Sequence, residues 1–315
     1  MLTLEKVAER LLENDNIYIL THQFPDGDAL GSGFALCKAL NYLGKKAKVL
    51  VVGEYPKKFE YLKSGIDECN FESDYIVSVD VADEKLLGEN KDIYSGRIDL
   101  AIDHHESHRL FAKESYVDGK SGANAEIIYK IIKLLKVPFD KDISNAIYTG
   151  ICTDTGCFKY PNATSETFRI VADVIDSGAE SAKISREMFD TKSFARVRME
   201  CAVLDNIELF ANNKASVICV TLDLLKETGA KDEEIEGLSS LPRQIEGVLV
   251  GVMIREKKLG GYKISVRTTG EYNASEICAI FGGGGHRGAG GCTIDGTLEE
   301  VKEKLKNEIT KFIGE

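Results

Sequence analysis

The sequence predicts an α/β protein: an N-terminal parallel-sheet domain with helices on both faces, plus a smaller C-terminal α/β domain with a mixed sheet. Up to about residue 190, buried-type strands alternate with helical patterns, as in parallel sheets with crossover helices. Beyond residue 207, three strands follow with only one further helix between the last of them and the glycine-rich end. The length of 315 residues also exceeds the ~250–300 residues at which single cores stop growing.

These observations divide the chain into three segments. We expect a first domain over residues 1–190, a helical linker over 191–206 and a second domain over 207–315. The division follows the change from alternating strands and helices to consecutive strands.

The composition excludes several classes of protein. Hydrophobic residues make up 43% and charged residues 29%, which is typical of a globular protein. No stretch reaches the ~18 apolar residues of a membrane span, so no membrane partner is expected. The net charge of −11 and the lack of a basic stripe argue against long nucleic acid as a partner. The amphipathic, acidic start of the chain is not the pattern we expect of a signal peptide, and we predict a cytoplasmic location.

Cysteine usage agrees with a reducing compartment. The eight cysteines are Cys37, Cys69, Cys152, Cys157, Cys201, Cys219, Cys278 and Cys292. None forms a C-x-x-C pair and most lie in apolar runs, so we expect buried, reduced thiols rather than disulfides or a zinc site.

The first domain opens with a helix over 3–14 and a buried strand over 16–21. A turn on Pro25 and Gly27 follows, and a helix over 29–43 ends at Gly44. The remaining predicted strands are 47–52, 75–80 and 98–103, and the remaining helical patterns are 56–64, 123–136, 142–152, 164–177, 180–190 and 193–206.

The second domain contains predicted strands over 216–221, 248–256 and 262–270. A short helix over 273–281 is capped by Asn273. The glycine run GGGGHRGAGG, a strand over 292–294 and a final helix over 297–313 complete the chain.

Acidic and imidazole side chains gather where the strands of the first domain end. They are His22, Asp26, Asp28, Asp80, Asp103, His104 and His105, joined by Asp154 in a loop between helical segments. Since the carboxyl ends of parallel strands face one crevice, these groups should meet there. The first group alone is equally well explained as helix-capping aspartates with a stray histidine. However, four of the five histidines lie in or beside these segments, which favours a shared site.

A cluster of aspartates needs positive charge, because neighbouring carboxylates resist joint ionisation. The motif segments contain no Lys or Arg, so divalent cations are the natural counter-charge. Oxygen ligands with imidazole suit Mn²⁺, and Mg²⁺ or Zn²⁺ less well. There are too many ligands for one ion, so we predict two ions that activate a water for in-line hydrolysis at phosphorus.

The glycine run allows two interpretations. Gly283, Gly285 and Gly288 fit the dinucleotide-binding pattern, but they follow a helix rather than a strand, so that context fails. The run is either an anion-binding nest of backbone N–H groups, with His286 and Arg287 as added donors, or a tight turn that only glycine can follow.

Five motifs, in this order and spread over the whole chain, resemble the DHH phosphoesterase family. They are HQFPDGD from His22, SVDVAD around Asp80, AIDHHESH around Asp103, GICTDTG around Asp154 and FGGGGHRGAGG from Phe281. The resemblance implies a catalytic DHH domain followed by a DHH-associated substrate-binding domain.

The resemblance also implies residue roles. One metal would be held by His22, Asp26 and Asp80, and the second by Asp28, Asp80, His104 and Asp154, with Asp80 as the bridge. Asp103 would orient its neighbours, and His105 would contact the scissile phosphate or the leaving oxygen. In the second domain the implied substrate-binding residues are Arg267, Gly283, Gly284, Gly285 and His286.

The resemblance is greatest to the branch that hydrolyses very short RNA and 3′-phosphoadenosine 5′-phosphate. We therefore expect a manganese-dependent phosphoesterase with short RNA oligonucleotides or a nucleotide bisphosphate as partners, and a homodimer stays open. A cyclic-dinucleotide phosphodiesterase is the alternative among enzymes, and a nucleotide-binding regulatory protein is the alternative outside them. His108, Gly288 and Gly290 depart from the family pattern, which puts substrate preference in doubt.

Overall fold

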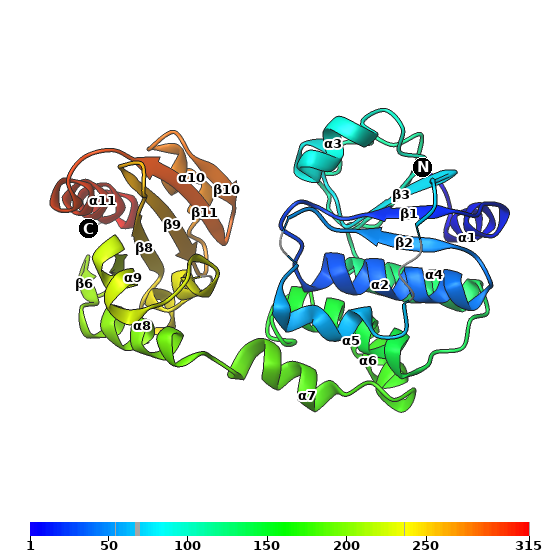
Figure 1. The fold of residues 1–315 in the computed structure, drawn as a ribbon. Coiled ribbons are helices and arrows are strands. Elements are labelled where there is room, and N and C mark those ends of the chain that lie inside the picture. The colour runs from blue at the N-terminus through cyan, green and yellow to red at the C-terminus, as the bar shows by residue number, and fades with distance from the viewer. Residues whose placement is uncertain (54, 67–69, 236, 315) are drawn as a thin grey trace. The chain divides into compact units, whose positions relative to one another are not determined.

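The computed structural model describes residues 1–53, 55–66, 70–235 and 237–314. The chain forms two units, Met1–Thr191 and Lys192–Glu315, each with its own sheet (Figure 1).

The N-terminal sheet is parallel throughout, with the strand order β2-β1-β3-β4-β5. Its strands are β1 Ile17–Leu20, β2 Ala47–Leu50, β3 Tyr75–Val79, β4 Leu100–Asp103 and β5 Glu114–Val117. The first four confirm the predicted strands. The sequence analysis missed β5, an edge strand whose four residues ESYV include no aliphatic residue before Val117, so no apolar run marks it.

The strand order places a topological switch between β1 and β3. The chain leaves β1 toward β2 on one side and returns to β3 on the other, and ligands of open α/β sheets bind beyond the carboxyl ends at such a point. Because side chains alternate along a strand, each strand serves two cores: Ile17 and Ile19 face the larger cluster, whereas Leu20 faces the smaller one.

Helices cover both faces of this sheet, as predicted (Figure 1). The larger cluster contains α1, α2, α4 and α5, and the smaller one contains residues around η2 and α3. The helical segments are α1 Leu4–Glu13, α2 Gly27–Tyr42, η1 Lys57–Lys63, η2 Glu84–Leu87, α3 Glu89–Tyr94, α4 Asn124–Leu134, α5 Lys141–Asp154, α6 Ser165–Asp176, α7 Ser181–Ser185 and the π-helical η3 Arg186–Asp190.

Two of the helix boundaries that differ from the prediction affect the site. Helix α2 begins at Gly27 rather than 29, because the Asp26 carboxylate caps it. Helix α5 runs to Asp154, so this residue is the last of a helix and does not lie in a loop.

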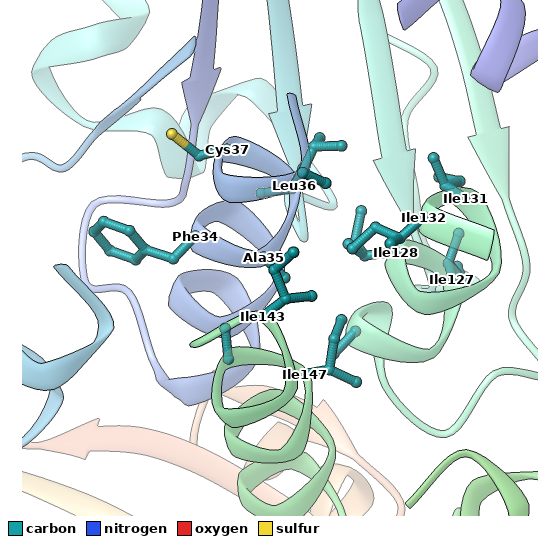
Figure 2. Close-up of a cluster of buried hydrophobic side chains, with 14 of the residues drawn as sticks. Phe34, Ala35, Leu36, Cys37, Ile127, Ile128, Ile131, Ile132, Ile143 and Ile147 are labelled. Carbon is teal, nitrogen blue, oxygen red and sulfur yellow. The ribbon is translucent and has the colours of Figure 1, made fainter. Parts of the chain in front are cut away.

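Helices α2 and α5 pack backbone against backbone. A Cβ added to Gly31 of α2 would overlap the carbonyl oxygen of Ala146 and would lie 2.8 Å from the amide nitrogen of Gly150. Around this contact, Leu36 of α2, Ile128 of α4 and Ile147 of α5 fill the core (Figure 2). The close approach brings the ends of α2 and α5 that carry aspartates toward each other.

The C-terminal unit has a mixed sheet of six strands in the order β10-β11-β9-β8-β7-β6, in which only β7 and β8 are parallel neighbours. The strands are β6 Glu208–Phe210, β7 Ala215–Val220, β8 Val250–Glu256, β9 Tyr262–Thr268, β10 Gly284–His286 and β11 Ala289–Ile294. The mixed sheet was predicted, whereas the three-residue strands β6 and β10 were not. The part of the glycine run at Gly284–His286 is thus an ordered edge strand rather than flexible backbone.

The helical segments of this unit are α8 Phe194–Asp205, α9 Leu222–Thr228, η4 Asp232–Ile235, η5 Leu238–Ser240, η6 Pro242–Gln244, α10 Ala274–Ala279 and α11 Leu298–Ile313. One cluster packs α10 and α11 on the sheet, and a second packs α8 and α9 against β7 and β8. Met199 and Val203 of α8 are buried in the second cluster, although α8 lies in the segment predicted as a linker. The linker role of residues 191–206 stays a prediction.

The described cysteines are all free thiols, as expected, and Cys69 lies outside the described residues. The prediction that the thiols are buried is wrong for Cys201 on α8, which is exposed, and two other cysteines are half-buried. Within the part of the chain that the structure describes, no helix is long and apolar enough to cross a membrane.

Candidate metal centre

The loop after β1 delivers the first cluster. The Asp26 carboxylate accepts hydrogen bonds from the amides of Asp28 and Ala29 at 3.0 and 3.1 Å, which fixes the start of α2. The Nε2 atom of His22 lies 3.8 Å from the Asp26 Oδ1 atom. The capping interpretation of this stretch is therefore correct for Asp26, and it coexists with a histidine placed beside it.

Asp80 follows β3 in an unusual backbone conformation. Its φ is +58°, in the left-handed region that aspartate tolerates better than most residues. Its amide donates to the carbonyl of Ile102 at 3.0 Å, which ties it to β4. The side chain is 4% exposed, and its Oδ1 atom has no hydrogen-bond partner among the described residues. A buried carboxylate oxygen in this state lacks the partner that such atoms normally have.

Asp103 at the end of β4 is buried as completely, but its oxygens are saturated. Oδ1 accepts from the amide of His104 at 2.8 Å and from the amide and Nδ1 atom of His105 at 3.3 and 2.8 Å. Oδ2 lies 2.8 Å from the Nδ1 atom of His108. With both oxygens in use, Asp103 holds two imidazoles and a backbone turn.

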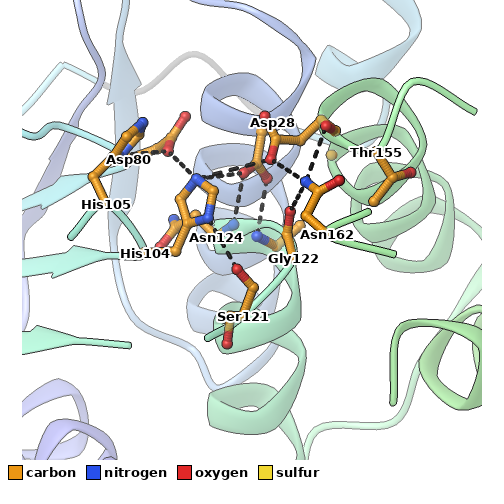
Figure 3. Close-up of polar contacts among 12 residues, drawn as sticks. Asp28, Asp80, His104, His105, Ser121, Gly122, Asn124, Thr155 and Asn162 are labelled. Atoms are coloured by element: carbon orange, nitrogen blue, oxygen red, sulfur yellow. Dashed lines mark hydrogen bonds and ion pairs between the residues drawn. The ribbon is translucent and has the colours of Figure 1, made fainter. Parts of the chain in front are cut away.

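His104 presents its other nitrogen to three carboxylates. Its Nδ1 atom lies 3.2 Å from the carbonyl oxygen of Ser121, which favours a proton on Nδ1 and a free lone pair on Nε2. The Nε2 atom lies 3.5 Å from Asp80, 3.8 Å from Asp28 and 3.9 Å from Asp154 (Figure 3). Metal-bound histidines are typically oriented in this way, by a hydrogen bond from the ring nitrogen that does not bind the metal.

Asp28 is held by the start of α4. Its carboxylate accepts from the amides of Asn124 at 2.6 Å and Ala125 at 2.9 Å (Figure 3). The space is tight, because a Cβ on Gly150 would lie 2.5 Å from the Cβ of Ala125 and 2.8 Å from the Asp28 Oδ1 atom. Helix α5 therefore needs glycine at this position to approach the Asp28 carboxylate.

Asp154 enters the cluster from the end of α5. Asn162 donates to its carboxylate at 3.3 Å and to the carbonyl of Gly122 at 2.8 Å, so one amide joins two sides of the site. The Asp154 side chain is 30% exposed, more than those of Asp28 and Asp80, so this side of the cluster is open to solvent.

The electrostatics divide the aspartates into two kinds. Burial, followed by the charges of Asp28 and other carboxylates, raises the pKa of Asp80 well above its ordinary value. Burial likewise raises the pKa of Asp28, against opposing interactions with His104 and backbone amides. Burial and Asp28 raise the pKa of Asp154 to about 7.

The other two aspartates have a lowered pKa. Burial opposes ionisation of Asp103, but the hydrogen bonds from His105 and His108 outweigh it and lower the pKa. At Asp26, His22 and the capping amides outweigh burial in the same way. At the first kind, burial and neighbouring carboxylates outweigh the imidazoles nearby, whereas at the second kind hydrogen bonds from histidines and amides outweigh burial.

Four of these aspartates, together with three of the histidines, fit divalent cations. Three sets of ligand atoms lie within 4.8 Å of one another: His22, Asp26 and Asp80; Asp28, His104 and Asp154; and Asp80, His104 and His105. Asp80 is shared between sets, and its Oδ1 atom is the unpartnered one. Oxygen and imidazole donors of this kind suit Mn²⁺, Mg²⁺ or Zn²⁺.

The sequence analysis missed several residues that build the centre. Ser121 and Gly122 come from the loop between β5 and α4, Asn124 is the first residue of α4, and Asn162 comes from the segment after α5. Behind them, the buried Glu126 accepts from the Gly122 amide and from the Thr167 hydroxyl. Had β5 been recognised, the loop after it would have been a candidate by the same rule as the other strand ends.

Two of the predicted residues of the second unit, Arg267 and His286, share one row of its sheet. His286 of β10 is opposite Ala289 of β11, which is opposite Arg267 of β9. Their side chains therefore stand on one face, about 10 Å apart across two strand spacings. Gly283 donates to the carbonyl of Cys278, and Gly284 and Gly285 pair with β11.

Family models match most of both units. The model described as DHH family, N-terminal domain, matches residues 16–151, and the DHHA1 domain matches residues 214–315. The bifunctional oligoribonuclease and PAP phosphatase NrnA of Thermus thermophilus is 32% identical over 307 residues, which cover 94% of this chain and 90% of that protein. The protein of the same name from Bacillus subtilis is 26% identical and covers 89% of this chain and 90% of its own length.

Two further proteins are similar to this chain, one over nearly its whole length and one more distantly. The crystal structure of an exopolyphosphatase-related protein from Bacteroides fragilis superposes with a TM-score of 0.89 at 26% identity, covering 99% of this chain and 97% of that one. The cyclic-di-AMP phosphodiesterase GdpP of Bacillus subtilis is more distant, at 22% identity, and the match covers 97% of this chain but 49% of that protein.

Proposed function

We propose, from the premise that the chain belongs to the DHH family and is a phosphoric ester hydrolase, that it hydrolyses short oligoribonucleotides and 3′-phosphoadenosine 5′-phosphate at a centre of two divalent cations. The observation that carries the proposal is the convergence of Asp28, Asp80 and Asp154 on the Nε2 atom of His104 within 3.9 Å.

The metal ligands of the proposal follow the clusters of the centre. His22, Asp26 and Asp80 would hold one ion, and Asp28, His104 and Asp154 the other. Asp80 would also serve the second ion and so be the bridge, since its Oδ1 atom lies 3.5 Å from the Nε2 atom of His104. When bound, two such ions supply a water-derived nucleophile at neutral pH and positive charge beside the phosphoryl oxygens. Manganese is the ion we expect, with magnesium as the alternative.

His105 is proposed as the catalytic residue beside the metal ligands. Its Nδ1 atom is held by Asp103, and this hydrogen bond is the main cause of its raised pKa. A ring that retains both protons can donate from Nε2 to a phosphoryl or leaving oxygen while Asp103 holds the other side. The side chain is 41% exposed, so it is accessible to a substrate.

The second unit is proposed to hold a part of the substrate that does not react. Arg267 and His286 stand in one row of the sheet, and the backbone beside them belongs to Gly283, Gly284 and Gly285. An arginine, an imidazole and glycine amides are groups that bind phosphate, although the Gly283 amide already donates to the carbonyl of Cys278.

A panel of substrates tests this function. The protein with Mn²⁺ is incubated with 3′-phosphoadenosine 5′-phosphate, pApA, an RNA five-mer, cyclic di-AMP and pyrophosphate, and products are separated by chromatography. We expect AMP and phosphate from the first substrate, and mononucleotides from the next two. Preferred cleavage of cyclic di-AMP would instead establish the cyclic-dinucleotide alternative, and turnover of pyrophosphate alone would contradict the proposal.

The alternative of a regulatory protein without activity is not supported, since the family and the NrnA relatives indicate a hydrolase. The cytoplasmic location and the homodimer stay predictions.

A further inference from the structure

The C-terminal unit contains a cavity that the proposed function does not use. It has a volume of about 720 Å³, within the roughly 300–1,000 Å³ of small-ligand pockets. Four cations line it, Arg255, Lys257, Lys258 and Lys263, from the hairpin that joins β8 and β9. Phe281, Gly282 and Gly291 of the glycine-rich segment line it as well. We call this cavity the cationic hollow.

The charge of the cationic hollow is only partly compensated. Asp232 pairs with Arg255 at 3.0 Å and lies 3.6 Å from Lys258. The other acidic lining residue, Glu256, accepts a hydrogen bond from the amide of Leu222 at 2.9 Å. The ammonium groups of Lys257 and Lys263 form no ion pair or hydrogen bond with another described residue. Two unpaired cations in one cavity stand out on a chain whose net charge is −11.

The strand register connects the hollow to the row of Arg267 and His286. Lys263, Ser265 and Arg267 alternate with buried residues along β9, so they share one face. Lys263 is opposite Arg255 on one side and Thr293 on the other, and Ser265 is opposite Gly291. The four-residue step from Lys263 to Arg267 spans about 13 Å. Between the two cationic ends, Ser265 has the small Gly291 beside it on β11 and the larger, buried Met253 beside it on β8.

We propose that the cationic hollow binds a nucleotide phosphate, and that an oligonucleotide extends along β9 from Arg267 to Lys263. The inference rests on the proposed function for the identity of the strand. A nucleotide bisphosphate held at Arg267 does not reach the far end, whereas a longer oligonucleotide does. The wall also contains the aromatic residue Phe281, whose ring has the Lys304 ammonium 5.7 Å from its centroid.

Two kinds of molecule carry a phosphate that fits the cationic hollow. One is a substrate, through its far nucleotides, and the other is a free mononucleotide that acts as an effector. The shared lining residues Gly282 and Gly291 belong to the glycine-rich segment, which favours the substrate.

Binding without turnover gives the first test. The affinity of the full chain for a fluorescent RNA five-mer and for labelled pApA is measured by anisotropy in EDTA, in the wild type and in the double variant Lys257→Gln, Lys263→Gln. We expect the variant to bind the five-mer about three- to tenfold more weakly, as expected for two exposed charge contacts, and pApA with unchanged affinity. The salt slope for the five-mer should flatten by about 0.7 per lost contact.

The matched control is the double variant Lys226→Gln, Lys311→Gln, which removes two exposed lysines of the same unit outside the hollow. It should bind both ligands like the wild type. Equal weakening for five-mer and pApA, or equal effects of the two double variants, would overturn the proposal. Because no turnover is needed, this outcome is distinct from failure of the proposed hydrolysis.

The effector source is tested with 5′-AMP. Its effect on hydrolysis of 3′-phosphoadenosine 5′-phosphate is compared between the wild type and the Lys257, Lys263 variant. An effect of AMP that the variant loses supports the hollow as a site for a free nucleotide. If the variant changes neither this effect nor five-mer binding, the hollow is not a phosphate site.

Discussion

The metal centre and the face of β9 that carries Lys263 and Arg267 (the β9 face) differ in how their charged side chains are held. In the centre, Asp28 and Asp80 are buried, and their positions are fixed by backbone amides and strand ends. On the β9 face, Lys263 is exposed and forms no ion pair or hydrogen bond through its ammonium group with another described residue, and Arg267 is half-buried. Burial in the metal centre disfavours the ionised form of the carboxylates, but it fixes their geometry. An exposed lysine keeps its hydration, so its charge costs little free energy and attracts phosphate from several positions. We therefore expect changes in the centre to affect kcat and changes on the face to affect KM.

The largest effect should come from Asp80→Asn. The amide keeps the size and tolerates the left-handed backbone, but it loses the charge that the proposed bridge requires. We expect kcat to fall about 10³-fold or more, together with loss of bound metal. Asp92→Asn on the exposed side of α3 is the control. A variant at position 80 that keeps both rate and metal content contradicts the assignment.

His105→Ala should be the next largest. It removes the donor held by Asp103 but no proposed metal ligand, so kcat and kcat/KM should fall together by about 10²–10³ with metal content unchanged. Metal analysis and steady-state kinetics on the same preparation decide this. Loss of an ion from the variant would instead make His105 a metal ligand, which its place near Asp80 and His104 allows.

Arg267→Gln and His286→Ala should have smaller effects that appear in KM. Loss of one charged hydrogen bond to phosphate predicts a rise of about tenfold for Arg267→Gln, and a lesser rise for His286→Ala. Melting temperatures should stay near the wild-type value, which separates binding from stability. If KM for the shortest substrates is unchanged in both variants, the second unit takes no part in holding them.

The smallest effect is a pH dependence of the metal-free protein. The raised pKa values of Asp28, Asp80 and Asp154 mean that the folded state binds more protons than the unfolded chain above pH 3.8. Stability in EDTA should therefore decrease as pH rises toward about 7, the pKa of Asp154.

Calorimetry at pH 5 and pH 8, with and without Mn²⁺, measures this effect. Each ~1 kcal/mol shifts the melting temperature by about 2–4 °C for a domain of this size. The stabilisation by Mn²⁺ should be larger at pH 8, because the ligands must be deprotonated to bind it. A melting temperature in EDTA that rises between these pH values is the opposite of the expected result.

The strands that end in aspartate were predictable because their apolar runs are unambiguous and their ends coincide with the acidic residues. The position of Asp154 at a helix end and the strand β5 were not, because a polar four-residue edge strand has no period that a sequence shows. The roles of His104 and Asp103 depend on the carbonyl of Ser121 and on His108, which only tertiary structure places. His108 attracted notice as a departure from the family pattern, and the structure shows what it contacts.

The glycine run illustrates a different limit. The sequence left open whether it forms an anion nest or a tight turn, and neither interpretation included a strand. Gly284–His286 pairs with residues 289–291, so both strands of this hairpin come from the run itself, and a Cβ on Gly285 would lie 2.7 Å from the Cα atom of Gly290. Its part in substrate binding stays a prediction.

Gly150 has a consequence for how mutational surveys of this protein are interpreted. The position has no side chain, yet a single added methyl group would press on a carboxylate oxygen of Asp28 and on Ala125. In a survey scored by activity, alanine at position 150 would rank with the loss of an aspartate, although no atom of Gly150 takes part in the chemistry. Such a survey therefore maps both the groups that act and the empty space that lets them meet.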